Sequence, residues 1–357
     1  MTKVAFYAPM KPPTHPVPSG DRAMGRAILA ALRDGGIEAD LVSKLQTRDK
    51  DGHVDTQARL LALAEAEATR LIAQGRYADW QVWITYHCYY KAPDLVGPTV
   101  AAALNLPYFQ IEATRARKRL NGPWSTFAQA AEAASDAADV IFHLTARDAE
   151  SLYAYAPAHQ RIVHLPPFLP RNDLPPASSG DGPMLSVGML RHGDKFASYE
   201  LIADTLTLLK TPDWRLVIAG DGPALNAVAS IMQPFGDRVE LRGSLDDAAL
   251  GEAYGQASLL FWPGVNEAFG MTYLEAQAAG LPVVAQDRPG VIDVLAPHQH
   301  PTPAGGPEAL AQEIDLLLGD CAERARRGQA ARDYVATHHL LGAASKTLCD
   351  AITGTIA

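Results

Sequence analysis

The stretch from Trp262 to Glu275, which reads WPGVNEAFGMTYLE, decides the local fold. The apolar run that leads into it, residues 257–262, predicts a buried strand of a parallel sheet. Pro263-Gly264 ends that strand. A helix is expected to begin after Phe269-Gly270-Met271 and to stop at Gly280-Leu281-Pro282. The stretch therefore predicts a strand, a sharp turn and a helix.

Two carboxylates flank this turn, since Glu267 precedes the helix and Glu275 lies inside it. The N-terminal end of a helix carries free N–H groups and a partial positive charge, which favour phosphate. Carboxylates do not bind phosphate, but they accept hydrogen bonds from hydroxyl groups on either side of one. A sugar nucleotide has that pattern around its diphosphate, so the stretch predicts a sugar-nucleotide site.

The length of 357 residues favours two domains, because one core stops growing before that size. An apolar content of 48% with 20% charged residues is typical of a globular protein. The net charge of −9 argues against a nucleic-acid partner. The same charge weakens attraction to anionic membranes, although a local basic patch leaves peripheral membrane contact open.

The lack of a recognisable targeting signal favours a cytoplasmic protein. The apolar part of the first residues is too short for a secretion signal, and no stretch approaches the roughly 20 apolar residues that cross a bilayer. Cys88, Cys321 and Cys349 are far apart and form no metal-binding or redox spacing. Three free thiols in a reducing compartment are expected.

Alternating strands and helices predict an α/β fold with two doubly wound halves. Strands are expected near residues 4–8, 39–42, 81–86, 107–112, 139–144 and 161–165, and again near 184–187, 214–219, 239–241, 257–262 and 283–285. The proline-rich residues 166–183 predict a linker between the halves. Ligand sites belong at the carboxyl ends of such strands.

Three familiar motifs are absent from the sequence. No GxGxxG follows the first strand, which disfavours a nicotinamide enzyme. The chain also lacks GxSxG and GxxxxGK[ST], which disfavours a serine hydrolase and a phosphate-loop ATPase.

The run from Trp262 to Ala285 resembles the signature of retaining, GT-B-fold glycosyltransferases of family 4, the glycosyl transferases group 1. That signature has two glutamates separated by seven residues, a Phe-Gly between them and a later Gly-x-Pro-Val-Val. Residues 217–223 are similar to the family's Gly-x-Gly segment, and Leu165-Pro166-Pro167 resembles the strand end before its interdomain linker.

The resemblance implies two Rossmann-like domains facing a central cleft. Residues 1–168 would form the acceptor domain and residues 169–342 the nucleotide-sugar donor domain. A C-terminal helix at about 343–357 would pack back on the first domain.

On the donor side, the resemblance assigns the hydroxyls of the transferred sugar to Glu267 and the ribose hydroxyls to Glu275. Lys195 and Arg191 would bind the diphosphate, although Met189 stands where the family usually has that arginine. The remaining donor-binding candidates are glycines and main-chain N–H groups, namely Gly20, Gly188, Gly220, Phe269, Gly270 and Met271.

On the acceptor side, His87 at a strand end is a candidate for contact with the sugar or acceptor, and a packed histidine is the alternative. Asp21 is either an acceptor contact or the cap of the first helix. Arg115, Arg119 and Trp124 predict either a solvated loop or a site for an anionic acceptor gripped by arginines and an aromatic ring. The family's His-Asp pair after the strand 107–112 is replaced by Glu112-Ala113-Thr114-Arg115.

The expected function is transfer of a sugar from a nucleotide-diphosphate sugar to an acceptor hydroxyl with retention of configuration. Cations and a helix end can stabilise the leaving diphosphate, so neither a metal nor a further cofactor is expected. Two alternatives stay open, a sugar-nucleotide epimerase or hydrolase of the same fold and a two-domain sugar-binding protein. The base, the sugar and the acceptor depend on pocket shape.

Overall fold

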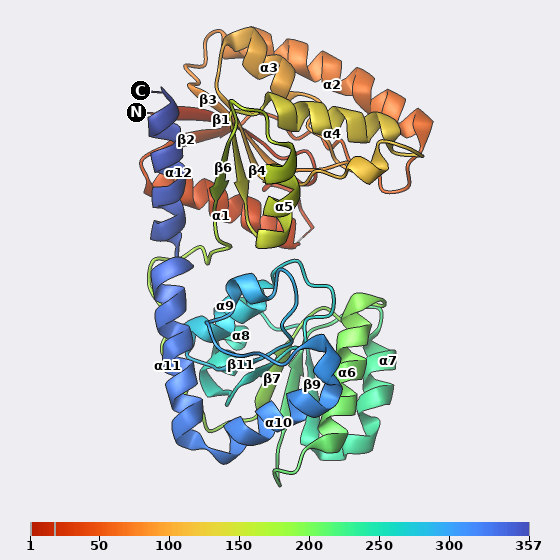
Figure 1. Cartoon of the computed structure of the whole chain (residues 1–357), viewed down its shortest axis with the longest axis vertical. Helices are drawn as coiled ribbons and strands as arrows, with labels where there is room; N and C mark the ends of the chain where they lie inside the picture. The colour runs from red at the N-terminus through yellow and green to blue at the C-terminus, as the bar shows by residue number, and fades with distance from the viewer. Residues whose placement is uncertain (1, 18, 357) are drawn as a thin grey trace. The chain divides into compact units, whose positions relative to one another are not determined.

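A computed structural model describes residues 2–17 and 19–356, which divide into two compact units. The first unit contains the described residues up to Pro166 and those from Leu341 onward, and the second is Pro167–Leu340. The chain passes between the units twice, at 166–167 and at 340–341. Each unit contains one parallel sheet with helices, so the predicted α/β class is confirmed (Figure 1).

The first unit is built on a six-stranded sheet in the order β2-β1-β3-β4-β5-β6, with every neighbouring pair parallel. The central strands are almost fully buried because helices cover both faces, which explains their continuous apolar sequence. The six strands are β1 (Lys3–Tyr7), β2 (Glu38–Leu41), β3 (Val82–Cys88), β4 (Tyr108–Ala113), β5 (Val140–His143) and β6 (Arg161–His164).

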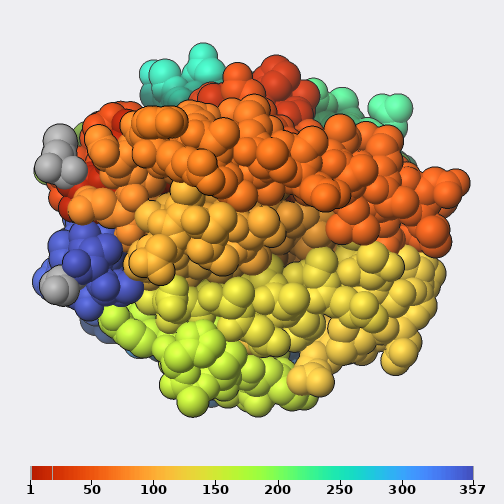
Figure 2. All heavy atoms as spheres, turned by 90° about the horizontal axis from the view of Figure 1, so that it is seen from above, coloured from red at the N-terminus to blue at the C-terminus, as the bar shows by residue number. Residues whose placement is uncertain are grey.

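The helices of the first unit follow the strands in the order that the alternation predicts. Helix α2 contacts α3, and α3 contacts α4, so the three form one layer. Figure 2 shows them as successive bands, from orange for α2 to yellow for α4. The helices are α1 (Gly20–Asp34), α2 (Val54–Gly75), α3 (Gly97–Leu104), α4 (Ser125–Ala137), α5 (Ala146–Tyr155) and α12 (Leu341–Ile356), with a 3-10 turn at Arg117–Arg119.

The last helix of the chain, α12, packs against the first helix, α1. Gly35 lies at the contact, where an added Cβ atom would be 2.0 Å from the Cys349 sulfur. The close crossing therefore requires a residue without a side chain. Leu341, Leu348 and Ile352 of α12 are buried there, so the end of the chain completes the first unit.

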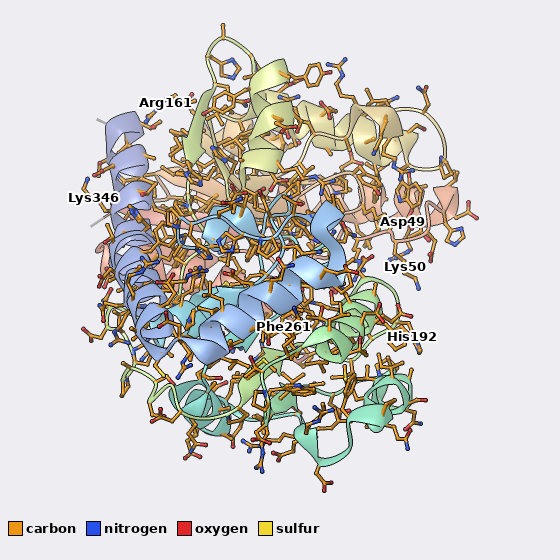
Figure 3. The ribbon with its side chains drawn as sticks, turned by 60° about the horizontal axis from the view of Figure 1, so that its bottom comes forward. Asp49, Lys50, Arg161, His192, Phe261 and Lys346 are labelled. Atoms are coloured by element: carbon orange, nitrogen blue, oxygen red, sulfur yellow. The ribbon has the colours of Figure 1, made fainter. Side chains whose placement is uncertain are left out.

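The second unit is built on a five-stranded parallel sheet in the order β11-β10-β7-β8-β9. Phe261, labelled in Figure 3, belongs to its central core and is fully buried. The strands are β7 (Met184–Val187), β8 (Leu216–Ala219), β9 (Val239–Gly243), β10 (Leu260–Phe261) and β11 (Val283–Val284). The expected six-residue strand at 257–262 is thus shorter than predicted, because only Leu260 and Phe261 pair with β11, and only Leu260 also pairs with β7.

Six helices surround this sheet, and Asp246 caps α8, with its carboxylate accepting from the Ala249 N–H at 2.9 Å. The helices are α6 (Asp194–Leu208), α7 (Leu225–Met232), α8 (Asp247–Gln256), α9 (Met271–Ala278), α10 (Gly306–Gly319) and α11 (Cys321–His338). Short 3-10 turns lie at Gln233–Arg238, Ile292–Val294 and Pro303–Gly305. Residues 166–183, expected as a linker, contain no helix or strand.

All three cysteines are free, as expected. Among the described residues, no helix combines the length and the apolar character that a membrane span needs.

Candidate functional site

The loops that follow β7 and β10 lie at the carboxyl edge of the second sheet, because both strands run in the same direction. Lys195 lies in the first turn of α6, after β7. Glu267 lies in the loop after β10, and Trp262 directly follows that strand. The fold thus brings together two residues that are far apart in sequence.

Glu267 is held by two donors. Lys195 Nζ forms an ion pair with Glu267 Oε1, and Trp262 Nε1 donates to the same oxygen at 3.0 Å. Lys195 Nζ also lies 5.1 Å from the centroid of the Trp262 ring. The side chains of Lys195 and Glu267 are 18% and 13% exposed, so the pair is reachable yet partly shielded from water. Such a carboxylate is fixed in place to accept hydroxyl hydrogen bonds.

The start of α9 has the free N–H groups that the sequence predicts. Gly270 is its N-cap residue, with φ 78° and ψ 93°, and among the described residues no side chain caps this end. An added Cβ atom at Gly270 would lie 2.7 Å from the Tyr273 ring, so glycine is required there. Phe269 and Met271 flank this turn, and the helix end offers donors to an anion.

The second glutamate of the motif, Glu275, lies one turn inside α9. Tyr254 of α8 donates its hydroxyl hydrogen to Glu275 Oε2 at 2.9 Å. Burial raises the pKa of Glu275, while the hydrogen bond from Tyr254 acts in the opposite direction. Tyr254 is a partner that the sequence analysis missed, since no local pattern joins it to a residue on another helix.

The other donor-side candidates have different surroundings. Arg191 is exposed in the loop before α6, next to His192, which Figure 3 labels. Gly188 and Gly220 end neighbouring strands, and an added Cβ atom at Gly220 would be 1.9 Å from the Gly188 carbonyl oxygen. The N–H groups of both glycines already donate to carbonyls, at 3.1 and 2.8 Å. These glycines therefore let two loops pack closely, and their N–H groups are not available to a phosphate.

His87 and Asp21 form the main polar pair at the carboxyl edge of the first sheet. His87 Nδ1 and Asp21 Oδ1 are 2.8 Å apart. Burial lowers the pKa of His87, but the charges of Glu112 and Asp21 and the hydrogen bond to Asp21 outweigh it, so this pKa is raised. The pKa of Asp21 is lowered mainly by its hydrogen bond with His87.

The prediction that Asp21 caps α1 is wrong. Ser19 is the N-cap residue, and its hydroxyl accepts from the Arg22 N–H at 3.3 Å. Asp21 lies in the first helical turn, which directs its carboxylate to His87 instead. Gly20 is the first residue of α1, and an added Cβ atom there would meet nothing within 4 Å.

Glu112 is a polar residue whose position the sequence noted without giving it a role. His87 and Glu112 both have positive φ angles, 61° and 60°, which are uncommon for residues with side chains. Glu112 Oε2 is buried and has no hydrogen-bond partner among the described residues. Burial raises the pKa of Glu112, and the charge of His87 opposes that shift. Positive φ angles and an unpartnered buried oxygen are features that are common at binding sites.

The prediction that Arg115 grips an acceptor is wrong. Its side chain is 1% exposed, and it forms ion pairs with Glu132 at 2.9 Å and Asp136 at 2.7 Å, both from α4. A guanidinium enclosed by two carboxylates fixes α4 to the loop after β4 and is not available to a ligand.

Arg119 and Trp124 lie close together in the structure, and Tyr90 and Lys91 lie beside them. The guanidinium of Arg119 lies 5.2 Å from the Tyr90 ring and 5.5 Å from the Trp124 ring. Lys91 Nζ lies 5.1 Å from the Trp124 ring, and the Tyr90 and Trp124 rings meet edge to face at 5.7 Å. We call Tyr90, Lys91, Arg119 and Trp124 the cation–aromatic cluster. Two cations and two rings suit an anionic, ring-containing ligand.

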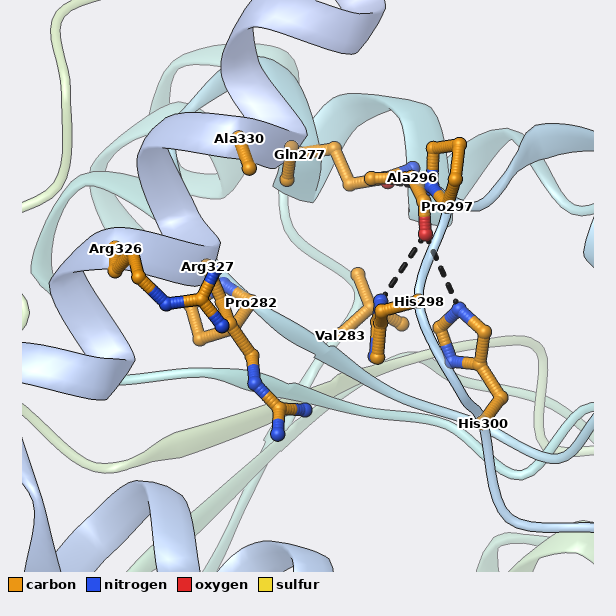
Figure 4. A pocket seen from close by; sticks show the side chains of 11 residues that line it. Gln277, Pro282, Val283, Ala296, Pro297, His298, His300, Arg326, Arg327 and Ala330 are labelled. Atoms are coloured by element: carbon orange, nitrogen blue, oxygen red, sulfur yellow. Dashed lines mark hydrogen bonds between the residues drawn. The ribbon is translucent and has the colours of Figure 1, made fainter.

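A small pocket of about 50 Å³ lies in the second unit beside α11 (Figure 4). His298 and His300 both approach the Ala296 carbonyl oxygen there, at 3.1 and 3.3 Å. Arg327 lines the same pocket and forms an ion pair with Glu313. Burial lowers the pKa of both histidines, that of His300 to about 4. The charge of Arg327 is already paired with that of Glu313. The pocket therefore has room for water, and this arginine is not available to bind a ligand.

In the comparison with known proteins, the family match lies within the second unit of the chain. Residues 184–334 match the family described as glycosyl transferases group 1. An exopolysaccharide phosphotransferase of Streptomyces coelicolor is 33% identical over 190 residues, 52% of this chain and 20% of that protein. A GDP-mannose-dependent alpha-mannosyltransferase of Mycolicibacterium smegmatis is 35% identical over 145 residues, 40% of this chain and 36% of that protein. The matches thus span about a third or less of these relatives.

Solved structures resemble the whole chain. Sucrose-phosphate synthase from Thermosynechococcus elongatus has a TM-score of 0.73 at 17% identity, with 99% of both chains covered. HepE of Anabaena, solved in complex with UDP, has a TM-score of 0.73 at 12% identity, with 99% of this chain and 100% of that chain covered.

Two parallel α/β sheets, each with its own helices, and these structural neighbours define the GT-B class of fold. Within that class, residues 184–334, most of the second unit, match the glycosyl transferases group 1, the family that the sequence resembles. The predicted family and fold are confirmed.

Proposed function

We propose that this protein transfers a sugar from a nucleotide-diphosphate sugar to an acceptor hydroxyl, with retention of configuration. The observation that carries the proposal is the contact of Lys195 and Trp262 with one oxygen of Glu267, beside the uncapped start of α9. The carboxylate can accept hydrogen bonds from sugar hydroxyls. The cation and the helix end can donate hydrogen bonds to an anion at the same edge of the sheet.

Breaking a sugar–phosphate bond creates positive charge at the anomeric carbon and negative charge on the leaving diphosphate. Lys195, Arg191 and the N–H groups at the start of α9 are the donors proposed for the diphosphate, and fixed donors need no reorganisation during the reaction. Glu267 accepts hydroxyls of the transferred sugar, and Glu275 those of the ribose. The Tyr254 hydroxyl keeps Glu275 oriented while its carboxylate is partly buried.

In this proposal the first unit binds the acceptor and the second unit binds the donor. Support for an acceptor site comes from His87, Asp21 and Glu112 at the carboxyl edge of the first sheet and from the cation–aromatic cluster. Arg119 and Lys91 favour an acceptor that carries a phosphate or carboxylate group, and Trp124 favours one with a sugar ring.

The donor is the first thing to test. A thermal-shift screen against uridine, guanosine and adenosine diphosphate sugars should reveal one that raises the melting temperature by mass action. Uridine and guanosine sugars lead the panel, because HepE was solved with UDP and one relative is named for GDP-mannose. A flat response to every sugar nucleotide would contradict the proposal.

Glu267→Gln should lower kcat by roughly 100-fold or more, because the variant keeps the shape but loses the charge that faces the reacting sugar. Glu252→Gln, an exposed glutamate of α8, is the matched control and should retain activity. Both variants should keep the melting temperature within a few degrees. Full activity of Glu267→Gln would rule out its proposed role.

Product analysis separates transfer from the two related reactions. Incubation with donor alone should give little free or isomerised sugar, and addition of the acceptor should release the nucleotide. Rapid turnover of donor alone would favour the epimerase or hydrolase alternative. Activity should also persist in EDTA, since the proposed anion donors are all side chains and N–H groups.

A further inference from the structure

We propose that the second unit contains a second ligand site, which binds a small phosphorylated metabolite the size of a monosaccharide phosphate. It is a pocket of about 300 Å³, which we call the amino-edge pocket. Its volume is at the lower end of the range of roughly 300–1,000 Å³ for small-molecule sites.

The amino-edge pocket lies on the opposite edge of the sheet from the donor site. Its lining residues Asp181, Ser258 and Pro282 come shortly before β7, β10 and β11. Glu267 and Lys195 follow strands of the same parallel sheet. Because the strands are parallel, residues before them and residues after them lie at opposite edges. The pocket is therefore separate from the site proposed for the sugar nucleotide.

Two arginines of α11 line the pocket and are held in place by main-chain carbonyls. Arg324 donates to the Leu317 carbonyl at 2.8 Å, and Arg332 donates to the Ala278 carbonyl at 2.5 Å. Each of these bonds uses one Nη1 atom, and a guanidinium has five N–H groups to donate. Neither arginine forms an ion pair within residues 2–17 and 19–356, so two fixed positive charges remain for a ligand.

A buried hydroxyl gives the second, independent sign of a ligand. Ser258 lines the pocket and is 4% exposed, yet its Oγ has no hydrogen-bond partner among the residues that the structure describes. An unpaired buried hydroxyl is costly, so it calls for a partner. Ser179, Asp181 and Gln329 add further hydrogen-bonding groups around the opening.

The close approach of α11 to the end of α9 shapes this pocket. An added Cβ atom at Gly328 would lie 2.1 Å from the Gly280 carbonyl oxygen, so glycine at 328 brings the two helices together. Arg324 and Arg332 lie on either side of Gly328, four residues away in each direction, and so share its helix face.

The chemistry of the lining selects the ligand class. Two unpaired guanidinium groups match a phosphate, and Arg is the side chain that binds phosphate oxygens in pairs. Hydroxyl, amide and carboxylate groups match the hydroxyls of a sugar. A phosphate joined to a small polyhydroxylated body satisfies both sets, whereas a neutral sugar leaves the arginines without an anion.

Isothermal titration calorimetry of the full chain tests the site, with glucose 6-phosphate, glucose 1-phosphate, fructose 6-phosphate, inorganic phosphate and glucose as probes. At least one sugar phosphate should bind saturably, at least tenfold more tightly than glucose. No binding of any phosphate-bearing probe would overturn the proposal. Tight binding of inorganic phosphate alone would also overturn it, since it would show an anion site without a sugar subsite.

A matched pair of variants locates the binding. Ala325→Glu places a carboxylate at the pocket, on an exposed position of α11, and should weaken binding at least tenfold. Ala336→Glu makes the same change on an exposed position of the same helix away from the pocket and should bind like the unaltered protein. Equal binding by both variants would assign the ligand elsewhere and reject the amino-edge pocket.

Ser258→Ala gives a readout that a purely structural pocket would not produce. Removal of an unpaired buried hydroxyl should keep or raise the melting temperature of the free protein, while the affinity for the sugar phosphate falls. An unchanged affinity would show that Ser258 is not part of a site. Because none of these residues belongs to the proposed donor site, the result is independent of the proposed transferase activity.

Discussion

His87 illustrates how single residues are tuned by their neighbours. Its backbone adopts a positive φ of 61°, which turns the side chain at the end of β3 towards Asp21. Two carboxylates then raise the pKa of His87 despite its burial. The hydrogen bond between His87 and Asp21 therefore stabilises the folded protein fully between pH 3.8 and pH 6.5, the ordinary pKa values of the two groups. That stabilisation is lost as the pH rises through the raised pKa of His87 and as it falls through the lowered pKa of Asp21.

Asp21→Asn should lower the pKa of His87, because it removes one charge and weakens a charge-assisted hydrogen bond. Histidine titration by NMR would measure the shift. Asp34→Asn, at the other end of α1, is the control and should leave His87 unchanged. An unaltered His87 titration in Asp21→Asn would show that Glu112 and Asp148, and not Asp21, raise the pKa.

The pKa of His300 is shifted in the opposite direction from that of His87. Burial lowers its pKa to about 4, whereas the unfolded chain has a pKa of 6.5. The unfolded state therefore takes up the proton first, and stability falls as the pH drops from 6.5 towards 4. The loss attributable to His300 reaches about 3 kcal/mol at the acid end.

His300→Asn should make the second unit less sensitive to acid, because the residue no longer titrates. Denaturant unfolding at pH 7 and at pH 4.5 would measure the difference. His159→Asn, an exposed histidine of the first unit, is the control. If both variants showed the same loss of stability as the unaltered protein, burial of His300 would not be the cause.

At the scale of elements, glycines decide which helices can approach. Gly328 in the middle of α11 faces the Gly280 carbonyl, and Gly251 in the middle of α8 faces open space. Intrinsic helix propensity favours alanine over glycine by about 1 kcal/mol at both positions. At Gly328, packing requires glycine although helix propensity favours alanine. At Gly251, packing leaves room for alanine, so the two effects do not conflict.

Gly328→Ala should destabilise the protein by about 2 kcal/mol or more, because the new methyl group forces α11 away from the end of α9. Gly251→Ala should stabilise it by about 0.5–1 kcal/mol. Denaturant unfolding of the two variants gives the comparison. Stabilisation by Gly328→Ala would show that α11 can shift without cost.

At the scale of the whole molecule, one unit is formed by a single continuous segment and the other by two separate segments. The second unit is continuous from Pro167 to Leu340, whereas the first needs the segment from Leu341 onward. Helix α12 buries Leu341, Leu348 and Ile352 and packs on α1. Removal of α12 exposes that apolar surface.

A fragment of residues 167–340 should fold alone, with a cooperative unfolding transition. A fragment of residues 1–166 should be insoluble or poorly folded, and joining residues 341–357 to it through a flexible linker should restore cooperative unfolding. Circular dichroism and thermal melts would measure this. Equal stability of the first-unit fragment with and without α12 would contradict the prediction.

The sequence determined the family, the alternation of strands and helices, and the donor motif. Buried parallel strands have continuous apolar runs, and turns and helix ends use glycine, proline and aspartate, so these features are readable locally. Glu267, Glu275 and Gly270 belong to one such stretch, which is why the motif could be recognised without a structure.

Only the tertiary structure decided the partners of the polar groups. Lys195 reaches Glu267 from another strand end, Tyr254 reaches Glu275 from another helix, and Arg115 is enclosed by carboxylates of α4. The charge of a residue is written in the sequence, but its partner depends on strand order and helix packing. The same reason explains why Arg115 resembled a ligand-binding residue, and why the amino-edge pocket had no sequence signal.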